Sequence, residues 1–199
     1  MARSVRRARG ARRRRGRRGA AAGRGGGRRG SAARRRRDRY AVVPIGVVRS
    51  ARTEPLDDEW DAVEARIEIG AGLPPECLDG IEGFSHAEVL YLFHLVDATS
   101  VERGSRHPRG NAAWPKVGIL AQGGRERPNR IGSAVVRILE REGRTLRVAG
   151  LDAVDGTPVL DVKPVYAEFL PRGAMRQPAW SRELMRDYWR RGEDRPAVP

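Results

Sequence analysis

Apolar and polar residues alternate along "VEARIEI", residues 63–69. The apolar residues from Val63 to Ile69 take one set of alternate positions, and three charged residues take the other. Successive side chains of a strand point to opposite faces, so this pattern predicts a strand with one buried face. The nearly continuous apolar run "AEVLYLFHLV", residues 87–96, instead predicts a strand buried on both faces.

Further apolar runs complete the predicted strands. "SAVVRILE" and "RTLRVAGL" flank the short sequence "REG", which predicts a hairpin. Other strands are expected in "YAVVPIGVVRS", "VGILA" and "TPVLDVKPVY". In "PAWSRELMRDYWRR", Trp180, Leu184 and Tyr188 recur at helical spacing, which predicts a helix with Ser181 as its N-cap. Six or seven short strands without intervening helices favour a mainly β fold, an antiparallel barrel or sandwich with a C-terminal helix.

Positive charge is concentrated in the first 39 residues. They hold 18 arginines and one acid, Asp38, a sum of +17 against +15 for the whole chain, so the remainder carries about −2. An Arg/Gly/Ala segment cannot form a core and its charges repel, which predicts disorder. The arm either binds nucleic acid through phosphates or is a tail or start-site artefact without function. We expect an arm at 1–39, a barrel domain at 40–175, and a helix and tail at 176–199.

The single cysteine, Cys77, excludes an intramolecular disulfide and a multi-cysteine zinc site. It fits a reducing cytoplasm. No apolar segment follows the basic N-terminus as in a signal peptide, and no apolar run approaches the roughly 18 residues of a membrane span. We therefore expect a soluble, cytoplasmic protein without a membrane partner or a bound metal.

Two histidines are candidates for chemistry. His86 stands at the entrance to a strand, where it is either a base or ligand donor, or a side chain bonded to local backbone. His94 lies inside the apolar run, where a polar ring needs a partner, and a core neighbour and a bound ligand are equally open.

The sequence "RERPNRIG", residues 125–132, predicts a turn that suits an anion. Pro128 fixes its own φ angle, and Gly132 permits close approach of the backbone. The flanking arginines offer donors that match carboxylate or phosphate. A solvated surface loop is the alternative.

A second turn is expected at "VDGT", residues 154–157, before the last strand. Asp161 and Lys163 lie two residues apart on that strand and so share a face. No hydrolase, zinc-peptidase or P-loop motif occurs, and the glycine-rich run "GRGGGRRG" follows no predicted strand, which excludes a Rossmann fingerprint.

Four blocks resemble, in the same order, the TsaA-like family, also called the TrmO family: "PIGVVRS", "LDGIEGFSHAEVLYLFH", "VGILAQGGRERPNRIGSAVVRIL" and "GLDAVDGTPVLDVKP". The resemblance covers about Val42 to Glu168. It implies a small antiparallel β-barrel that binds S-adenosylmethionine at a pocket near the interface of a homodimer. It also implies a methyltransferase that N6-methylates N6-threonylcarbamoyladenosine at position 37 of tRNA.

The resemblance also assigns site residues. It places cofactor contacts at the end of the apolar run, after "RPNRIG" and in the "VDGT" turn: His94, Leu95, Ser133, Val154, Asp155, Gly156 and Thr157. It places Arg127, Pro128 and Asn129 in the pocket wall, with Asp161 and Lys163 close by. Removal of the acceptor proton needs a base, for which His86, Asp155 and Asp161 are the candidates.

The chain departs from the family in four places. The family's "PRQ" is absent from residues 51–60, and Gly123 stands where the family has an arginine, a contact that is lost unless Arg125 replaces it. The insertion at 100–115 and the tail at 172–189 are not typical of the tRNA enzyme. Two alternatives therefore stay open: a methyltransferase acting on another RNA or a small molecule, and a non-enzymatic RNA-binding barrel.

Overall fold

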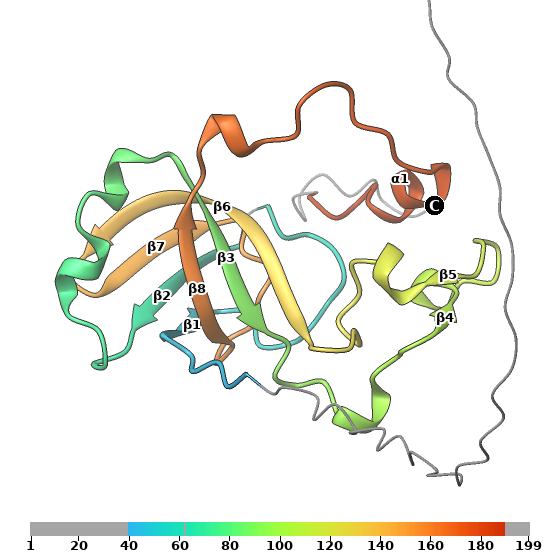
Figure 1. Ribbon diagram of the computed structural model, residues 1–199, viewed down its shortest axis with the longest axis horizontal. Helices are drawn as coiled ribbons and strands as arrows, with labels where there is room; N and C mark the ends of the chain where they lie inside the picture. Colours follow the sequence, from blue (N-terminus) through green and yellow to red (C-terminus); the bar gives the residue numbers. More distant parts are fainter. Residues whose placement is uncertain (1–39, 62, 190–199) are drawn as a thin grey trace, which may run out of the picture. The chain divides into compact units, whose positions relative to one another are not determined.

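A computed structural model describes residues 40–61 and 63–189. Its centre is a closed antiparallel barrel of six strands in the order β1-β2-β7-β6-β3-β8 (Figure 1). The strands are β1 (Gly46–Ser50), β2 (Glu64–Ile69), β3 (His86–Leu92), β6 (Ile131–Glu142), β7 (Thr145–Ala149) and β8 (Pro158–Pro164). The expected mainly β, antiparallel barrel is confirmed, and closure leaves no unpaired sheet edge in it.

Shorter elements occupy the connections. A two-stranded sheet, β4 (Ser105–Arg106) and β5 (Val117–Gly118), lies in the long connection between β3 and β6. The predicted strand "VGILA" is thus only partly a strand, because Ile119–Ala121 turns into a 3₁₀ helix. Other 3₁₀ turns are Pro75–Leu78, Ile81–Gly83, Ala98–Ser100, Pro108–Gly110 and Ala167–Phe169.

Strand patterning decides which side chains form the core. In β2, Ala65, Ile67 and Ile69 are buried, as their alternation predicts. β3 also alternates: Ala87, Val89 and Tyr91 are buried, whereas its other positions are half-buried or exposed. The prediction that this run is buried on both faces is therefore wrong, because only one face of a barrel strand meets the interior.

The inward side chains of all six strands meet in one core. Val48, Ile67, Val89, Val136 and Leu146 are fully enclosed, and burial of each such side chain contributes about 1.5–3 kcal/mol. The β6–β7 hairpin was expected and is formed. Its tip is a two-residue turn in which Gly143 adopts a φ of 54°.

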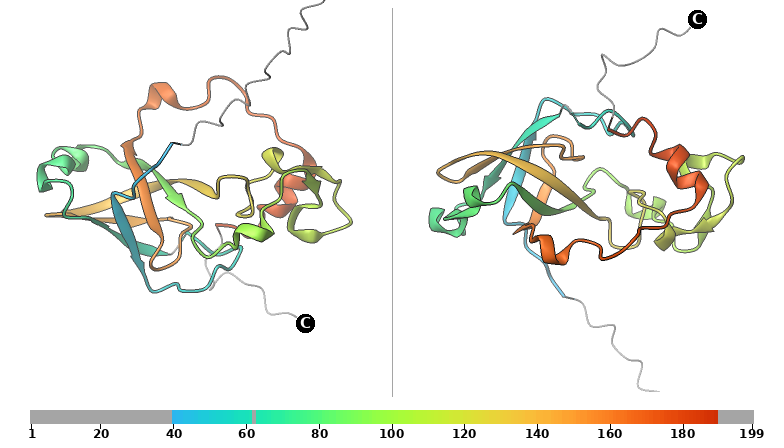
Figure 2. Two further views of the ribbon diagram at one scale, coloured as in Figure 1. Left: turned by 60° about the horizontal axis from the view of Figure 1, so that its bottom comes forward. Right: turned by 90° about the horizontal axis from the view of Figure 1, so that it is seen from above.

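After β8 the chain leaves the barrel and runs to the side where β4 and β5 lie (Figures 1 and 2). There it forms the helix α1 (Ala179–Leu184), which is shorter than predicted. Ser181 is not its N-cap: Pro178 holds that position, and the Ser181 hydroxyl donates to the Pro178 carbonyl from inside the first turn. The Trp114 indole donates to Glu183 over 2.8 Å and so ties the segment to the β4–β5 connection. No helix in the described part of the chain has the length and apolar character needed to cross a membrane.

Gly132, at the start of β6, lies directly beside the Tyr91 ring of β3. A Cβ atom at this position would lie 2.4 Å from two carbons of the ring. Tyr91 is 1% exposed, and its ring packs edge-to-face on Phe93. The absence of a side chain at 132 is therefore what leaves room for this aromatic ring in the barrel core.

We predict that Gly132→Ala lowers the free energy of unfolding by about 1–3 kcal/mol, because the added methyl group overpacks the Tyr91 ring. Urea unfolding followed by circular dichroism measures the change. Gly72→Ala is the control, since its Cβ would have no neighbour within 4 Å. A G132A variant as stable as the control would contradict this account of the glycine.

Candidate active site

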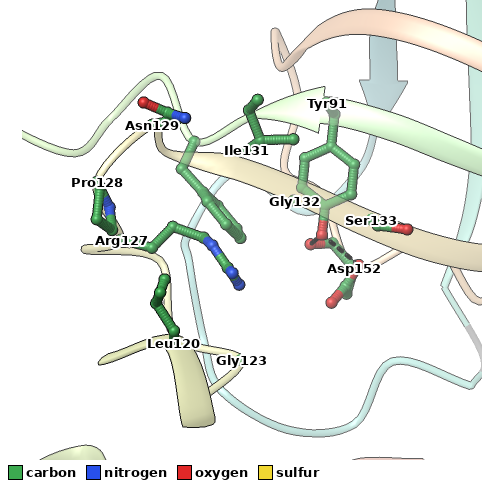
Figure 3. A pocket seen from close by; sticks show the side chains of 11 residues that line it. Tyr91, Leu120, Gly123, Arg127, Pro128, Asn129, Ile131, Gly132, Ser133 and Asp152 are labelled. Atoms are coloured by element: carbon green, nitrogen blue, oxygen red, sulfur yellow. Dashed lines mark hydrogen bonds between the residues drawn. The ribbon is translucent and has the colours of Figure 1, made fainter. Parts of the chain in front are cut away.

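A hollow of about 440 Å³ lies where β3 ends and β6 begins (Figure 3). Its volume falls within the range of small-molecule sites. Aromatic and aliphatic groups line it together with a few polar ones: Tyr91, Phe93, Leu120, Gly123, Arg127, Pro128, Asn129, Ile131, Gly132, Ser133 and Asp152. The "RPNRIG" loop thus forms a wall of this pocket.

The wall is a β-turn built from Arg127 to Arg130. The Arg130 amide donates to the Arg127 carbonyl over 2.9 Å, with Pro128 at the first central position of the turn. Arg130 adopts a φ of 54°, and its guanidinium donates to the Val96 carbonyl. The Arg130 carbonyl accepts from the Phe93 amide, so the loop is anchored to the end of β3.

Arg127 is a residue of this wall whose positive charge has no bonded partner among the described residues. Its half-buried side chain points inward from the turn (Figure 3), and none of the described residues bonds its guanidinium. A guanidinium offers five donors in a planar fork that matches a carboxylate. The anion-suited turn predicted from the sequence therefore has its donors directed into a cavity.

The opposite side of the pocket holds a carboxylate between two phenols. The Tyr91 hydroxyl donates to Asp152 Oδ1 over 2.5 Å, and the hydroxyl of Tyr188, from the C-terminal segment, donates to Asp152 Oδ2. Burial and the charge of Asp152 raise the pKa of both tyrosines far above its usual value. Both phenols therefore stay protonated and act as donors.

The connection between β7 and β8, residues 150–157, contains Asp152 in its first half and the "VDGT" turn in its second half. Gly156 adopts a φ of 75°, and its amide donates to the Val48 carbonyl. The Asp155 carboxylate accepts from the Ser50 amide over 3.0 Å, and Thr157 is buried. The turn is thus held against the end of β1.

His94 lies beside this turn. It follows β3 in a turn of its own and is half-buried, so it is not the residue within a buried strand that the sequence suggested. Its Nε2 atom lies 3.9 Å from where a Gly156 Cβ would be. The fold therefore brings His94 and the "VDGT" turn together, although 62 residues separate them. Leu95, next to it, is 60% exposed.

Ser133, Asp161 and Lys163 lie on the outer surface of the barrel. Ser133 is exposed and donates to Glu88 Oε1 over 2.8 Å, and it also lines the pocket. Asp161 and Lys163 share a face as predicted, with 3.9 Å between Nζ and Oδ2. In register, Asp161 is opposite Leu90, which is opposite Ser133, so two strand spacings separate Asp161 from the pocket edge.

His86 is placed at the opposite end of β3 from His94. It begins β3, whereas His94 follows the end of that strand, about 20 Å away at some 3.4 Å per residue. Its ring contacts the neighbouring Ser85 hydroxyl over 2.8 Å. None of the three candidate bases, His86, Asp155 and Asp161, lines the 440 Å³ pocket.

Three of the four departures from the family, the insertion, residues 51–60 and the tail, meet in one cluster, whereas Gly123 lines the pocket. Arg109, in the insertion, bonds Asp58 and the Asp57 carbonyl in the loop that lacks "PRQ". Arg125 donates to the Pro55 carbonyl of the same loop over 2.9 Å. The Trp60 amide of that loop donates to the Tyr188 carbonyl in the tail. Arg125 is thus engaged with this loop, and its guanidinium does not line the pocket.

Arg52 holds the same loop from within. Its guanidinium donates to the Glu59 and Asp58 carbonyls and lies 3.8 Å from the centre of the Trp60 ring. A guanidinium can satisfy several carbonyls of an irregular loop at once and stack on an aromatic ring. These departures therefore form one connected group of loops, which contacts the pocket residue Asp152 through the Tyr188 hydroxyl.

Sequence reasoning missed five residues that line the pocket, Tyr91, Phe93, Leu120, Ile131 and Asp152. It also missed Tyr188, which bonds Asp152 but does not line the pocket. Tyr91 and Phe93 were read only as part of an apolar strand, and Tyr188 only as a helical position. Asp152 precedes the "VDGT" turn by two residues and carried no signal of its own. The pairing of Gly132 with an aromatic residue on the neighbouring strand was the one available sign, and it needed the strand register.

The polar groups suit a zwitterionic ligand with an aromatic ring. Arg127 offers donors to a carboxylate, Asp152 accepts from a cation, and Phe93 supplies an apolar ring face or edge. Within the described residues there is no group of three or more His, Cys, Asp or Glu side chains that could hold a metal ion.

Comparison with known proteins identifies relatives. The sequence model of the domain described as tRNA-methyltransferase O N-terminal domain matches residues 49–169. A probable S-adenosyl-L-methionine-binding protein of Methanothermobacter thermautotrophicus is 39% identical over 135 residues, 63% of this chain and 89% of that protein. The human tRNA (adenine(37)-N6)-methyltransferase is 38% identical over 96 residues, 48% of this chain but 21% of the human protein.

The fold has a solved counterpart. The crystal structure of TrmO from Pseudomonas aeruginosa superposes with a TM-score of 0.57 at 30% identity, over 70% of this chain and 62% of that one. The chain thus spans less than two thirds of this structure and about a fifth of the human protein.

The ion pair of Glu126 with Arg106 supports the pocket loop and yields a pH prediction. Burial opposes ionisation of Glu126, but its 2.5 Å hydrogen bond to Arg106 and the charges of Arg106 and Arg125 outweigh burial and lower the pKa of the carboxyl. Because the carboxyl has a lower pKa in the folded state, its ionised form stabilises the fold at pH values above its unfolded-state pKa of about 4.3. This stabilisation is lost as the pH falls through the folded-state pKa.

We predict that Glu126→Gln lowers the free energy of unfolding by about 1–2 kcal/mol at pH 7, and that its difference from wild type shrinks below pH of about 4.3. Chemical unfolding at pH 7 and at more acidic pH measures this. The exposed Glu54, whose side chain forms no hydrogen bond or ion pair with any described residue, gives the matched control Glu54→Gln. A difference that stays constant with pH would contradict the assignment.

Proposed function

Because this chain belongs to the tRNA-methyltransferase O N-terminal domain family, we propose that it is an S-adenosylmethionine-dependent methyltransferase that N6-methylates threonylcarbamoyladenosine at position 37 of tRNA. The supporting observation is the pocket in which the "RPNRIG" wall faces Asp152, beside strand ends that carry the family's blocks. The proposal joins this geometry to relatives named for S-adenosylmethionine binding and for tRNA adenine-37 methylation.

We propose that the cofactor is held at the end of β3 and along the "RPNRIG" and "VDGT" loops. Arg127 would donate to the carboxylate of the amino-acid part, and Asn129 and Ser133 would border it. The backbone of the "VDGT" turn and the adjacent His94 would contact the nucleoside part. The residues proposed for this role are His94, Leu95, Arg127, Asn129, Ser133, Val154, Asp155, Gly156, Thr157 and Lys163.

Methyl transfer depends mainly on positioning. Bound S-adenosylmethionine would supply a methyl group on a sulfonium. The lone pair of the acceptor nitrogen would form a bond to the methyl carbon in line with the breaking C–S bond, whose electron pair would stay on the leaving thioether sulfur. The rigid strand ends and the Arg127–Arg130 turn would fix the angle between cofactor and acceptor, which is where most of the rate enhancement arises. The apolar, half-buried Phe93 would help to exclude water from the path of transfer.

The proton lost by the acceptor nitrogen needs an acceptor of its own. Of the three candidate bases, Asp155 lies on the turn next to His94, whereas Asp161 is on the outer face and His86 is at the far end of β3. We propose Asp155 for this role, with the Ser50 amide holding its carboxylate in place.

A second candidate function keeps the cofactor and changes the acceptor to another RNA or a small molecule. The observation that favours it is the cluster of departures. Arg109, Arg125 and the tail all bond the loop at residues 51–60, and the tail's Tyr188 bonds the pocket residue Asp152. A non-enzymatic RNA-binding barrel is the third reading and predicts no methyl transfer.

We propose a cytoplasmic homodimer for the assembly. Ile131 and Val135 are 37% and 52% exposed on the outer face of β6, and Leu95 lies at the nearby strand end. An apolar outer face beside the pocket is suited to a second copy of the chain. Sedimentation equilibrium tests this, and a monomer at micromolar concentration would contradict it.

Methyl transfer from labelled S-adenosylmethionine decides between the acceptors. We expect label in tRNA that carries threonylcarbamoyladenosine and none in tRNA that lacks it, with N6-methylated threonylcarbamoyladenosine identified by nucleoside mass spectrometry. Label in a small-molecule extract alone would favour the second function. Absence of any transfer by a protein that binds the cofactor would favour the third.

We predict that Arg127→Ala weakens binding of S-adenosylmethionine about 10- to 100-fold, because it removes a charge-assisted pair of about 1.5–3 kcal/mol. Isothermal titration calorimetry measures the affinity. Arg172→Ala, at an exposed position outside the pocket, is the matched control and should bind as wild type does. Equal affinity of both variants for S-adenosylmethionine would show that Arg127 does not bind the cofactor.

A further inference from the structure

We propose that Asp152 is a ligand-binding residue that holds the positively charged end of S-adenosylmethionine, and that Tyr91 and Tyr188 are its positioning residues. This inference rests on the cofactor proposed above and assigns it a residue that neither the motifs nor the relatives' names indicate. The geometry of three side chains carries it.

The first step is the fixed orientation of the carboxylate. Tyr91 donates to Oδ1 over 2.5 Å and also approaches the Asp152 backbone carbonyl, at 3.2 Å, while Tyr188 donates to Oδ2. A carboxylate has about four acceptor sites, so two remain after these bonds. Each oxygen is held by one phenol and still offers a site to a ligand. Asp152 lines the pocket (Figure 3).

The second step is the missing counter-ion. Asp152 is half-buried, and none of the arginines, lysines or histidines among the described residues forms an ion pair with it. The two groups that bond it are neutral phenols. A partly buried charge without an opposite charge is costly, and a cation bound in the pocket would offset that cost.

The third step is that two separate parts of the chain hold this carboxylate in place. On one side, the Tyr91 ring reaches Asp152 only because Gly132 has no side chain. On the other side, Tyr188 arrives from the C-terminal segment, fixed by the bond from the Trp60 amide to its carbonyl and by its edge contact with Trp189. Two independent parts of the chain thus converge on one side chain in a pocket wall.

The fourth step is charge complementarity across the pocket. Arg127 and Asp152 lie on different sides of the hollow, with the Arg127 guanidinium directed inward (Figure 3). The methionine part of the cofactor carries a carboxylate, an ammonium and a sulfonium. A guanidinium facing a carboxylate across a cavity matches that pattern, with Arg127 for the negative group and Asp152 for a positive one.

Three nucleosides test the inference by calorimetry on the full chain. S-adenosylmethionine carries both sulfonium and ammonium, S-adenosylhomocysteine carries only the ammonium, and 5′-methylthioadenosine carries neither. We expect Asp152→Asn to weaken binding of S-adenosylmethionine about 10-fold or more and to leave 5′-methylthioadenosine within about 2-fold of wild type. An equal loss for S-adenosylhomocysteine assigns Asp152 to the ammonium, and a loss confined to S-adenosylmethionine assigns it to the sulfonium.

Tyr188→Phe and Tyr91→Phe keep both rings and remove only the donors to Asp152. We expect each to weaken binding of the charged nucleosides about 3- to 10-fold without affecting 5′-methylthioadenosine. Tyr166→Phe is the matched control, because Tyr166 packs on Phe84 and Phe169 outside the pocket. Thermal unfolding of every variant shows which of them are folded.

The outcomes separate the inference from the proposed function. Wild-type protein that is folded and binds no S-adenosylmethionine overturns the cofactor assignment and this inference with it. Wild-type binding together with unchanged affinities in D152N overturns the inference alone. Equal losses for all three nucleosides in D152N and Y188F would also overturn it, because they would show that Asp152 only secures the C-terminal segment.

Discussion

The site depends on the placement of the Tyr91 ring in the space that Gly132 leaves open. That placement buries the ring in the barrel core, supports Phe93 by an edge contact and directs a hydroxyl to Asp152. Without it, β6 and β3 could still pair, but the pocket would lose its polar side. A single backbone position on β6 thus connects core packing with the chemistry of the pocket.

The loops around the pocket depend on a different interaction, the arginine–carbonyl hydrogen bond. Arg52, Arg109 and Arg125 each bond a backbone carbonyl in residues 55–59, and Arg130 does the same at Val96. Irregular chain has unsatisfied carbonyls, and a guanidinium can serve more than one of them. The low lysine content therefore has a structural consequence here, because an ammonium lacks the planar fork of donors that these loops use.

Sequence patterns predicted the strands well where one face is buried. β2, the β6–β7 hairpin and β8 follow from alternation and turn residues, because each depends on neighbours within a few positions. The run around His94 misled for a physical reason: apolar residues continue past the end of β3 into a turn whose Val96 is buried by loops and not by the barrel. Similarly, the C-terminal helix begins at Ala179, so that Pro178 and not Ser181 holds the N-cap position.

By itself the sequence determined the class of fold, the two turns and the blocks that carry the family resemblance, because these rest on local spacing. Only the tertiary structure decided which candidates meet. It placed Arg127, Ser133 and Asp152 around one hollow, put His94 beside Gly156, and left His86 at the opposite end of its strand. Barrel closure and strand register set these distances, and both arise from pairing between segments far apart in the chain, which no local pattern encodes.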